Sequence, residues 1–209
     1  MATTGLIILR HGETVWNRED RYQGHLDSPL TPLGLEQACA LAARLAASRC
    51  SALYSSDLGR ARHTAEIIAD KTGQRLQLDP RLRERHLGIF QGLVQSEIER
   101  KFPDDYRLFK SGDPDYVVPG GESSRQRFAC AIACFEELAS RHGGEQIAVV
   151  THGGVLSALF RHTLGIPLGA PRRFARSNAT WNLFTCQRKT WFLETWGDVS
   201  HLSGVPDAP

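Results

Sequence analysis

Near its start the chain reads Leu6-Ile7-Ile8-Leu9-Arg10-His11-Gly12-Glu13-Thr14. The apolar run, half of it β-branched, is typical of a short strand that is buried on both faces. The run stops at Arg10 and His11, and ligands of open parallel sheets bind beyond the carboxyl ends of the strands. Gly12 allows the backbone to turn sharply there. This stretch therefore predicts a buried strand that delivers a histidine to a binding pocket.

A second stretch repeats this arrangement and reads Ile147-Ala148-Val149-Val150-Thr151-His152-Gly153-Gly154. A single histidine at the end of a strand is most simply interpreted as a capped or otherwise satisfied side chain. Two buried strands that each end in a histidine and a glycine favour a shared site instead. We therefore expect the imidazoles of His11 and His152 to converge on one pocket.

The composition is that of an ordinary globular chain. Its 209 residues suit a single domain over 1–209, or one domain with a sizeable insertion, and can bury a large core. The net charge of +2 and the pI near 8.3 are too mild to indicate a nucleic-acid or membrane partner. No apolar run approaches the ~20 residues of a membrane span, and no signal-like N-terminus is present. We therefore expect a cytoplasmic protein.

The cysteines do not suggest disulfides. They are odd in number, scattered and mostly flanked by apolar residues: Cys39, Cys50, Cys130, Cys134 and Cys186. Such residues are typical of small buried side chains in a reducing compartment. Cys130 and Cys134 lie four apart on an expected helix and could share a metal, but a core stripe is the favoured interpretation. We predict no metal and no cofactor.

Helices and strands alternate along the chain. Short apolar runs predict strands at 6–9, 52–55, 76–78 and 147–150, and residues 181–186 and 190–195 predict a hairpin. Capping and breaking signals predict helices after Thr31-Pro32, from Ser56 or Asp57 as far as Gly73, between Ser123 and Gly143-Gly144, and after His152. This alternation predicts an α/β fold built on a layered sheet.

Residues 87–123 break this alternation. The segment holds short amphipathic pieces, several Gly and Pro turn signals, and the aromatic residues Phe90, Phe102, Tyr106, Phe109 and Tyr116. We interpret it as a lid insertion over the site. The polar loop 14–29 follows the first histidine and is long enough to suggest a functional role. We expect a frayed tail over 203–209.

The charged residues near the two histidines indicate a phosphate pocket. Arg10 adjoins His11, and Arg60 and Arg62 are equally good candidates in the first turns of the helix after 52–55. A helix N-terminus and planar guanidinium groups both suit a phosphate dianion. No phosphate-binding loop of the G-x-x-x-x-G-K-[ST] type, no H-x-x-x-H pair and no G-x-S-x-G elbow is present. Covalent catalysis by a neutral imidazole is the remaining route, with Glu84 as the best-placed proton donor.

Four motifs resemble the histidine phosphatase superfamily, which includes cofactor-dependent phosphoglycerate mutases and many small phosphatases. They are Arg10-His11-Gly12-Glu13-Thr14 with Asn17, Ser55-Ser56-Asp57-Leu58-Gly59-Arg60-Ala61, Leu82-Arg83-Glu84 and Thr151-His152-Gly153. The resemblance runs from Leu6 to about Leu164. It implies a three-layer α/β/α domain with a mainly parallel sheet and a partly helical lid insertion.

The resemblance also implies roles for single residues. His11 becomes the phosphorylated nucleophile, Glu84 the proton donor, and Arg10, Arg60 and His152 the phosphate pocket. The family pattern selects Arg60 over Arg62. It adds Asn17 and Gly153 as phosphate contacts, and we expect Gln23, Gly24 and Glu122 to touch the substrate.

Within this family a phosphatase is favoured over a mutase. Where the mutases carry tyrosine, lysine and asparagine, this chain has Leu87, Gln95 and Gly154. The lid insertion is shorter, lacks their paired arginines, and by its aromatic content suggests a less charged leaving group. Pro119-Gly120-Gly121-Glu122-Ser123 resembles the corresponding segment of the phosphatase branch.

The predicted function is metal-independent hydrolysis of a small phosphorylated metabolite through a phosphohistidine intermediate. The alternatives are a cofactor-dependent phosphoglycerate mutase and a non-catalytic phospho-ligand binder. The expected partner is a small phosphate ester, and a homodimer formed along the edge from Trp191 to Trp196 is possible.

Overall fold

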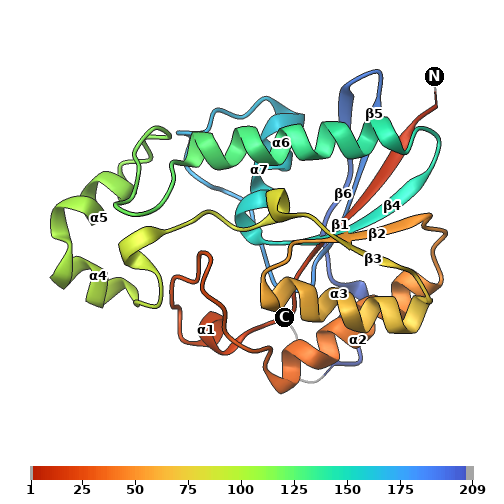
Figure 1. Ribbon diagram of the computed structural model, residues 1–209, viewed down its shortest axis with the longest axis horizontal. Helices are drawn as coiled ribbons and strands as arrows, with labels where there is room; N and C mark the ends of the chain where they lie inside the picture. The colour runs from red at the N-terminus through yellow and green to blue at the C-terminus, as the bar shows by residue number, and fades with distance from the viewer. Residues whose placement is uncertain (1, 206–209) are drawn as a thin grey trace.

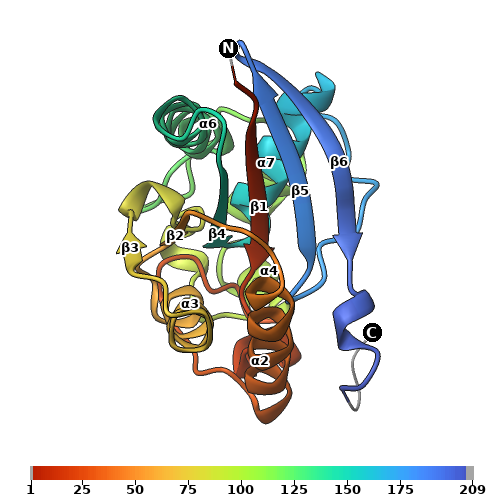
Figure 2. The ribbon, with the colours of Figure 1, turned by 90° about the vertical axis from the view of Figure 1, so that its right-hand side faces the viewer.

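The computed structural model describes residues 2–205 and is built on a 6-stranded sheet of strand order β3-β2-β4-β1-β5-β6, which Figure 2 shows from β3 to β6. The strands β3, β2, β4 and β1 pair in parallel, and the pairs β1–β5 and β5–β6 are antiparallel. In chain order they are β1 (Thr4–Arg10), β2 (Ala52–Ser55), β3 (Leu76–Leu78), β4 (Gln146–Thr151), β5 (Trp181–Gln187) and β6 (Thr190–Asp198). The predicted strands and the C-terminal hairpin are confirmed.

The two strands that carry the repeated motif are neighbours. β1 and β4 pair in parallel, with Ile8 opposite Val149 and Arg10 opposite Thr151. Because their registers end together, His11 and His152 leave the sheet at the same edge. The predicted convergence of the two histidines is confirmed.

Helices cover both faces of the sheet (Figure 1). One face carries α2 (Pro32–Ala46) and α3 (Gly59–Thr72), and the other carries α6 (Ser124–Arg141) and α7 (Gly153–Leu164). Each helix buries an apolar stripe, such as Ala38, Leu41, Ala42 and Leu45 of α2 against Ile7 and Leu9 of β1. Burial of such stripes is the main favourable term in the stability of the layers. The predicted three-layer α/β/α fold is confirmed.

Most predicted helix boundaries are confirmed, and one cap is different. The Thr31 side chain accepts a bond from Gly34 N, Ser123 forms a capping box with Gln126, and Gly73 ends α3 in the left-handed conformation. Neither Ser56 nor Asp57 caps α3, whose N-cap is Leu58. The side chain that accepts from the first amides of α3 belongs to Asp27, in a distant loop.

The insertion 87–123 lies beyond the carboxyl ends of the parallel strands, at the left of Figure 1. It contains the short 3-10 helix η2 (Gly88–Phe90) and the helices α4 (Gln95–Lys101) and α5 (Pro103–Lys110). Its aromatic side chains pack mainly on one another and on Ile98 and Val118, which gives the insertion a small core of its own. The aromatic content therefore holds the lid together, so it does not itself indicate an uncharged substrate.

The remaining segments are short. They are α1 (Val15–Arg18), η1 (Pro80–Leu82) and η3 (Ser200–Leu202). Within the tail that we expected to be frayed, the Val205 amide donates to the Leu202 carbonyl and its side chain packs on the core. Residues 206–209 of that tail lie outside the described residues. No helix in the described part of the chain is long and apolar enough to cross a membrane.

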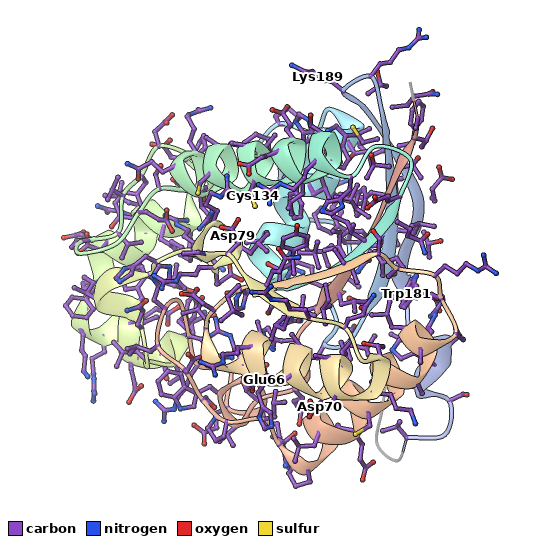
Figure 3. The ribbon with its side chains drawn as sticks, turned by 45° about the vertical axis from the view of Figure 1, so that its right-hand side comes forward. Glu66, Asp70, Asp79, Cys134, Trp181 and Lys189 are labelled. Carbon is purple, nitrogen blue, oxygen red and sulfur yellow. The ribbon has the colours of Figure 1, made fainter. Side chains whose placement is uncertain are left out.

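The surroundings of Cys134, which Figure 3 labels together with Asp79, bear on whether Cys130 and Cys134 form a metal site or a core stripe. Cys134 is buried in the core beneath α6, with its thiol 3.6 Å from the Asp79 carboxylate. Burial raises the pKa of this thiol to about 12. Cys130 is half-buried, and all five cysteines are free thiols. Cys134 is therefore part of a core stripe, as favoured.

The hairpin places β6 at one edge of the sheet. Trp191 is buried, and Trp196 packs inward against Phe160 and Phe174 with ring centroids 4.2 and 5.4 Å away. Lys189 projects from the hairpin turn (Figure 3). The two tryptophans thus contribute to the core rather than to an apolar outer edge.

A close backbone contact holds the loop after β1 against the start of α2. A Cβ atom on Gly34 would lie 2.0 Å from the Glu13 carbonyl oxygen, and one on Gly12 would lie 2.4 Å from the Gly34 carbonyl oxygen. Only glycines allow this approach, which fixes the chain that carries His11.

We predict that Gly34→Ala destabilises the protein by about 1–3 kcal/mol, since the added methyl group must push two backbone segments apart. For a chain of this size that corresponds to a fall in Tm of about 2–12 °C in a thermal scan. Gly143→Ala is the matched control, because a Cβ atom there meets nothing within 4 Å and its φ is not positive. Equal Tm values for the two variants would contradict the argument.

Candidate active site

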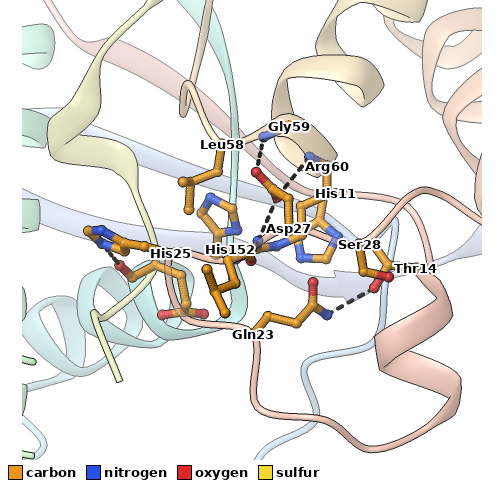
Figure 4. Close-up of polar contacts among 12 residues, drawn as sticks. His11, Thr14, Gln23, His25, Asp27, Ser28, Leu58, Gly59, Arg60 and His152 are labelled. Carbon is orange, nitrogen blue, oxygen red and sulfur yellow. Dashed lines mark hydrogen bonds and ion pairs between the residues drawn. The ribbon is translucent and has the colours of Figure 1, made fainter. Parts of the chain in front are cut away.

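Two buried imidazoles lie side by side at the ends of β1 and β4 (Figure 4). His11 is 3 % exposed and His152 is fully buried. Their ring centroids are 5.3 Å apart and their planes are inclined by 59°. Their short separation follows directly from the pairing of the two strands.

Hydrogen bonds fix the tautomer of His11. Its Nδ1 lies 2.7 Å from the Gly12 carbonyl, which can only accept, so Nδ1 carries the proton and Nε2 keeps its lone pair. The Asn178 amide donates to the carbonyls of His11 and Gly12 at 3.0 and 3.2 Å and holds this turn in place. Burial, followed by the charges of Arg60 and Arg10, lowers the pKa of His11 well below its usual value. The ring is therefore neutral at neutral pH.

His152 is held differently. Its Nε2 lies 2.8 Å from the Ser56 hydroxyl, and burial and the charge of Arg60 lower its pKa well below the usual value. Its Nδ1 is buried and has no protein partner within residues 2–205. A buried nitrogen without a partner is costly, and a bound oxyanion that shares a proton with it would satisfy it.

Arg60 is rigidly supported. It lies in the first turn of α3 and is 2 % exposed. Its Nη1 donates to the Asp27 carboxylate and the Leu26 carbonyl at 2.8 and 2.9 Å, and its Nη2 donates to the Gly24 carbonyl at 2.8 Å. Figure 4 shows Asp27 bridging Arg60 and the amide of Gly59 at the start of α3. One carboxylate thus fixes both the guanidinium and the helix end.

Arg10 approaches the histidines from β1. Its Nη1 donates to the Arg176 carbonyl, and its Nε is buried without a partner in the described chain. Burial lowers the pKa of Arg10 to about 10, and the charge of Arg176 adds to this shift. The guanidinium therefore remains charged at neutral pH.

Glu84 lines the cavity, and two backbone amides hold its carboxylate in place. Its Oε1 accepts from Arg85 N and its Oε2 from Gly154 N, each at 2.8 Å. The flanking guanidinium groups have other partners, since Arg83 pairs with Asp57 and Arg85 donates to the Glu122 carbonyl. Among the described residues neither guanidinium forms an ion pair with the Glu84 carboxylate.

These groups surround a cavity of about 420 Å³. The predicted site residues in its lining are Arg10, His11, Asn17, Gln23, Gly24, Arg60 and Glu84. His152 and Gly153 lie just behind it, because His152 contacts His11 and a Cβ atom on Gly153 would be 3.5 Å from Arg10 Nε. Glu122 is not among the residues that line the cavity. Its carboxylate accepts from His86 N at 2.8 Å, just before the start of the insertion 87–123.

Two polar residues of the loop 14–29 lie where expected. The Asn17 carbonyl oxygen accepts from Thr14 N at 3.1 Å and from the Asn178 amide at 3.2 Å. Gln23 is buried and donates to the Thr14 hydroxyl at 2.9 Å, which leaves its own carbonyl oxygen without a partner in residues 2–205. Both amides thus face the cavity with unused hydrogen-bonding capacity.

Several cavity residues are missing from the sequence-based prediction. Asn178 and Asp27 act through long-range contacts, and no local motif marks them. Arg127, Arg161, Arg172 and Arg176 also line the cavity. The basic run around Arg172-Arg173 was the one available signal for the last two. Within residues 2–205 no group of three or more His, Cys, Asp or Glu side chains is placed to hold a metal ion.

We predict that Asp27→Asn weakens the binding of inorganic phosphate, because Arg60 loses the charge that fixes it. The lost interaction is a partly exposed hydrogen bond between charged groups. We therefore expect the Kd for phosphate, measured by titration calorimetry, to rise about tenfold. Asp104→Asn removes a similar but largely exposed ion pair with Arg107 and serves as the control. A Kd that does not change in Asp27→Asn would mean that Arg60 is held by its two carbonyl contacts alone.

Comparison with known proteins agrees with this geometry. The family model described as histidine phosphatase superfamily (branch 1) matches residues 6–199. A phosphoglycerate mutase-like protein 4 of Arabidopsis thaliana is 41% identical over 200 residues, covering 94% of this chain and 86% of that protein. A metal-independent phosphoserine phosphatase of the same plant is 41% identical over 206 residues, covering 97% and 84%.

Solved structures extend the likeness to the whole fold. YhfR of Bacillus stearothermophilus superposes with a TM-score of 0.89 at 35% identity, covering 95% of this chain and 99% of that one. A mycobacterial glucosyl-3-phosphoglycerate phosphatase, solved in complex with VO3, gives 0.83 at 33% identity, covering 92% and 98%. The chain belongs to the histidine phosphatase superfamily.

Proposed function

We propose that this protein hydrolyses phosphomonoesters through a phosphohistidine formed on His11, without a metal ion. The observation that carries the proposal is the neutral, buried imidazole of His11, with a free Nε2 lone pair among fixed guanidinium groups. The names of the relatives support it, since they include a metal-independent phosphoserine phosphatase and a phosphatase that binds VO3.

In the first step His11 Nε2 attacks phosphorus as the P–O bond to the substrate alcohol breaks. Arg10, Arg60, Asn17 and the amide of Gly153, at the start of α7, bind the phosphoryl oxygens together with His152. These fixed groups stabilise charge that other phosphoryl-transfer enzymes neutralise with Mg²⁺. Glu84 donates a proton to the departing oxygen, so that a neutral alcohol leaves.

In the second step water replaces the alcohol. The Glu84 carboxylate accepts a proton from this water as its oxygen attacks phosphorus, and the N–P bond breaks. Inorganic phosphate leaves, and both His11 and Glu84 return to their starting protonation states. The anchoring of Glu84 by Arg85 N and Gly154 N suits this role, because both bonds hold the carboxylate at one place.

The second candidate is a phosphoglycerate mutase, in which a second alcohol rather than water takes the phosphoryl group. The mutase-like name of one relative favours it. The positions that separate the two activities argue for hydrolysis, since Leu87 and Gly154 line the cavity where the mutase pattern places tyrosine and asparagine. Gln95 begins α4 on the exposed side of the lid.

We further propose that the substrate is a small cytoplasmic metabolite and that two copies pair along β6. The free cysteines fit a reducing compartment. The edge position of β6 leaves one side of that strand without a neighbour in the described sheet. Light scattering of the purified protein tests the dimer, and a monomeric mass at micromolar concentration contradicts it.

The covalent intermediate is tested by rapid quench with a 32P-labelled phosphomonoester in EDTA. We predict acid-labile, alkali-stable label on the wild type and none on His11→Ala, which has no nucleophile. His152→Ala is the companion variant, and it should keep a trace of label because the arginines still bind phosphate. Equal labelling of both variants would refute the assignment, and formation of 2-phosphoglycerate from 3-phosphoglycerate would favour the mutase.

Glu84→Gln tests the proton donor by the choice of leaving group. General acid catalysis is worth about 10²–10⁴ in rate, so single-turnover phosphorylation by glycerol phosphate should slow by that factor. Phosphorylation by p-nitrophenyl phosphate should slow far less, since nitrophenolate leaves without a proton. If both substrates slow equally, Glu84 is not the proton donor and only shapes the site.

A further inference from the structure

The cavity carries far more positive charge than one phosphoryl group needs. Eight of its lining residues are arginines: Arg10, Arg21, Arg60, Arg85, Arg127, Arg161, Arg172 and Arg176. Glu84 is the one acidic residue in the same lining. Among the described residues only Arg21 and Arg60 of these arginines form ion pairs. Arginines that line a cavity without carboxylate partners are typical of a site for anions.

These arginines fall into two groups. Arg10 and Arg60 adjoin the histidines and are assigned above to the transferred phosphoryl group. Arg127 of α6, Arg161 of α7, and Arg172 and Arg176 of the connection between α7 and β5 form the second group. Arg176 lies where the two groups meet, because a Cβ atom on Gly153 would be 3.5 Å from its Nη1 and from Arg10 Nε. A phosphate dianion bound at the first group leaves the second group without a counter-charge.

The second group is built into the fold. Arg161 donates to the carbonyls of Pro167 and Ala170 at 2.6 and 2.7 Å, and its guanidinium lies 5.7 Å from the Phe174 ring centre. These contacts hold the connection that carries Arg172 and Arg176 against α7. Arg161 is therefore a positioning residue, with its donors already used.

Unused donors remain on the other members. Arg127 is 6 % exposed, and its Nε is buried with no partner in residues 2–205. The Nε of Arg176 is also buried without a partner there, and its Nη1 reaches the Ser157 hydroxyl only at 3.4 Å. Arg172 is exposed at the cavity rim and donates to the Phe174 carbonyl. Buried guanidinium N–H groups are rarely left unpaired, so a ligand or an ordered water is expected to complete them.

The mutual repulsion of these groups supports the same conclusion. Burial lowers the pKa of Arg176, the charge of Glu84 raises it, and the charges of Arg172 and Arg161 lower it further. The positive charges therefore destabilise one another, and an anion bound between them removes that cost.

We propose that the substrate carries a second anionic group, a carboxylate or a second phosphate, bound by Arg172, Arg176 and Arg127. The inference rests on the proposed function and narrows its substrate class to phosphomonoesters with a second negative charge. It also replaces the expectation of a less charged leaving group, since the aromatic residues of the lid pack mainly among themselves.

Two matched pairs of substrates test the proposal. 3-Phosphoglycerate is compared with glycerol 3-phosphate, and propane-1,3-diol bisphosphate with its monophosphate. We expect kcat/KM at least about tenfold higher for the doubly anionic member of one pair or both, in line with a charge-assisted hydrogen bond. The pair that responds tells whether the second anion is a carboxylate or a phosphate. Equal values within both pairs overturn the proposal.

Arg172→Gln should abolish most of this preference, because the exposed side chain can be replaced without disturbing the core. Arg173→Gln is the matched control, an adjacent arginine that is exposed but absent from the cavity lining. Equal losses in both variants would mean long-range attraction by net charge and would overturn the subsite. If Arg172→Gln keeps the preference, Arg127 and Arg176 alone bind the second anion, and Arg176→Gln should then abolish the preference.

A binding measurement separates this proposal from the proposed function. Titration calorimetry compares 3-phosphonopropionate with propylphosphonate, neither of which can be hydrolysed. Tighter binding of the carboxylated ligand, lost in Arg172→Gln, supports the subsite even if His11 were never phosphorylated. Hydrolysis of phenyl phosphate without any preference among anions would support the phosphatase and refute the subsite.

Discussion

The parallel pairing of β1 with β4 is the constraint on which the site depends. The two strands run in register from Gly5 opposite Gln146 to Arg10 opposite Thr151. Both are apolar, fully covered by helices, and hydrogen-bonded on both sides. A shift of one residue would turn every core side chain to the other face, so the register is strongly specified. The 5.3 Å separation of the two imidazoles is therefore fixed by the core and not by the loops.

The electrostatics of the site follow from what surrounds that pair. Two imidazoles without solvent, close to Arg10 and Arg60, cannot take up protons easily. A neutral imidazole is the form that can act as a nucleophile, so the same burial that stabilises the fold also suits His11 to its proposed role. The arginines themselves remain charged because their functional group is the most basic among side chains. The site is thus positively charged around a neutral His11 ring, a combination suited to a dianion.

The sequence was sufficient for the fold and for the core of the site. Short apolar strands, Thr31 and Ser123 as caps, and the two His-Gly repeats are local signals, and each was found where predicted. Asp27 could not be predicted, because it lies 32 residues before the helix whose N-terminus it binds and is marked by no motif. Arg127 and Arg161 were equally hidden, since an arginine on an amphipathic helix is usually a solvated surface group.

The lid shows a different limit of sequence reasoning. Its aromatic residues were interpreted as a lining for substrate, whereas Phe90 and Tyr106 are buried in a small core and only Phe109 of the five lines the cavity. An insertion that leaves the main sheet has to bury apolar surface of its own before it can keep a shape. Its composition therefore reports on its stability first and on the substrate only second. The arginines that α6, α7 and the connection after α7 contribute to the cavity are the better guide to what it accepts.

Gly154 fixes the position of Glu84, the proposed proton donor. A Cβ atom there would lie 2.0 Å from Glu84 Oε1, while the Gly154 amide donates to Oε2. Any side chain at this position must push the carboxylate away from the place it occupies here. The mutase pattern has asparagine at the position of Gly154, and the Glu84 position seen here leaves no room for that side chain. The absence of a side chain at Gly154 thus lets Glu84 lie close to the start of α7, the position that its proposed role in both steps requires.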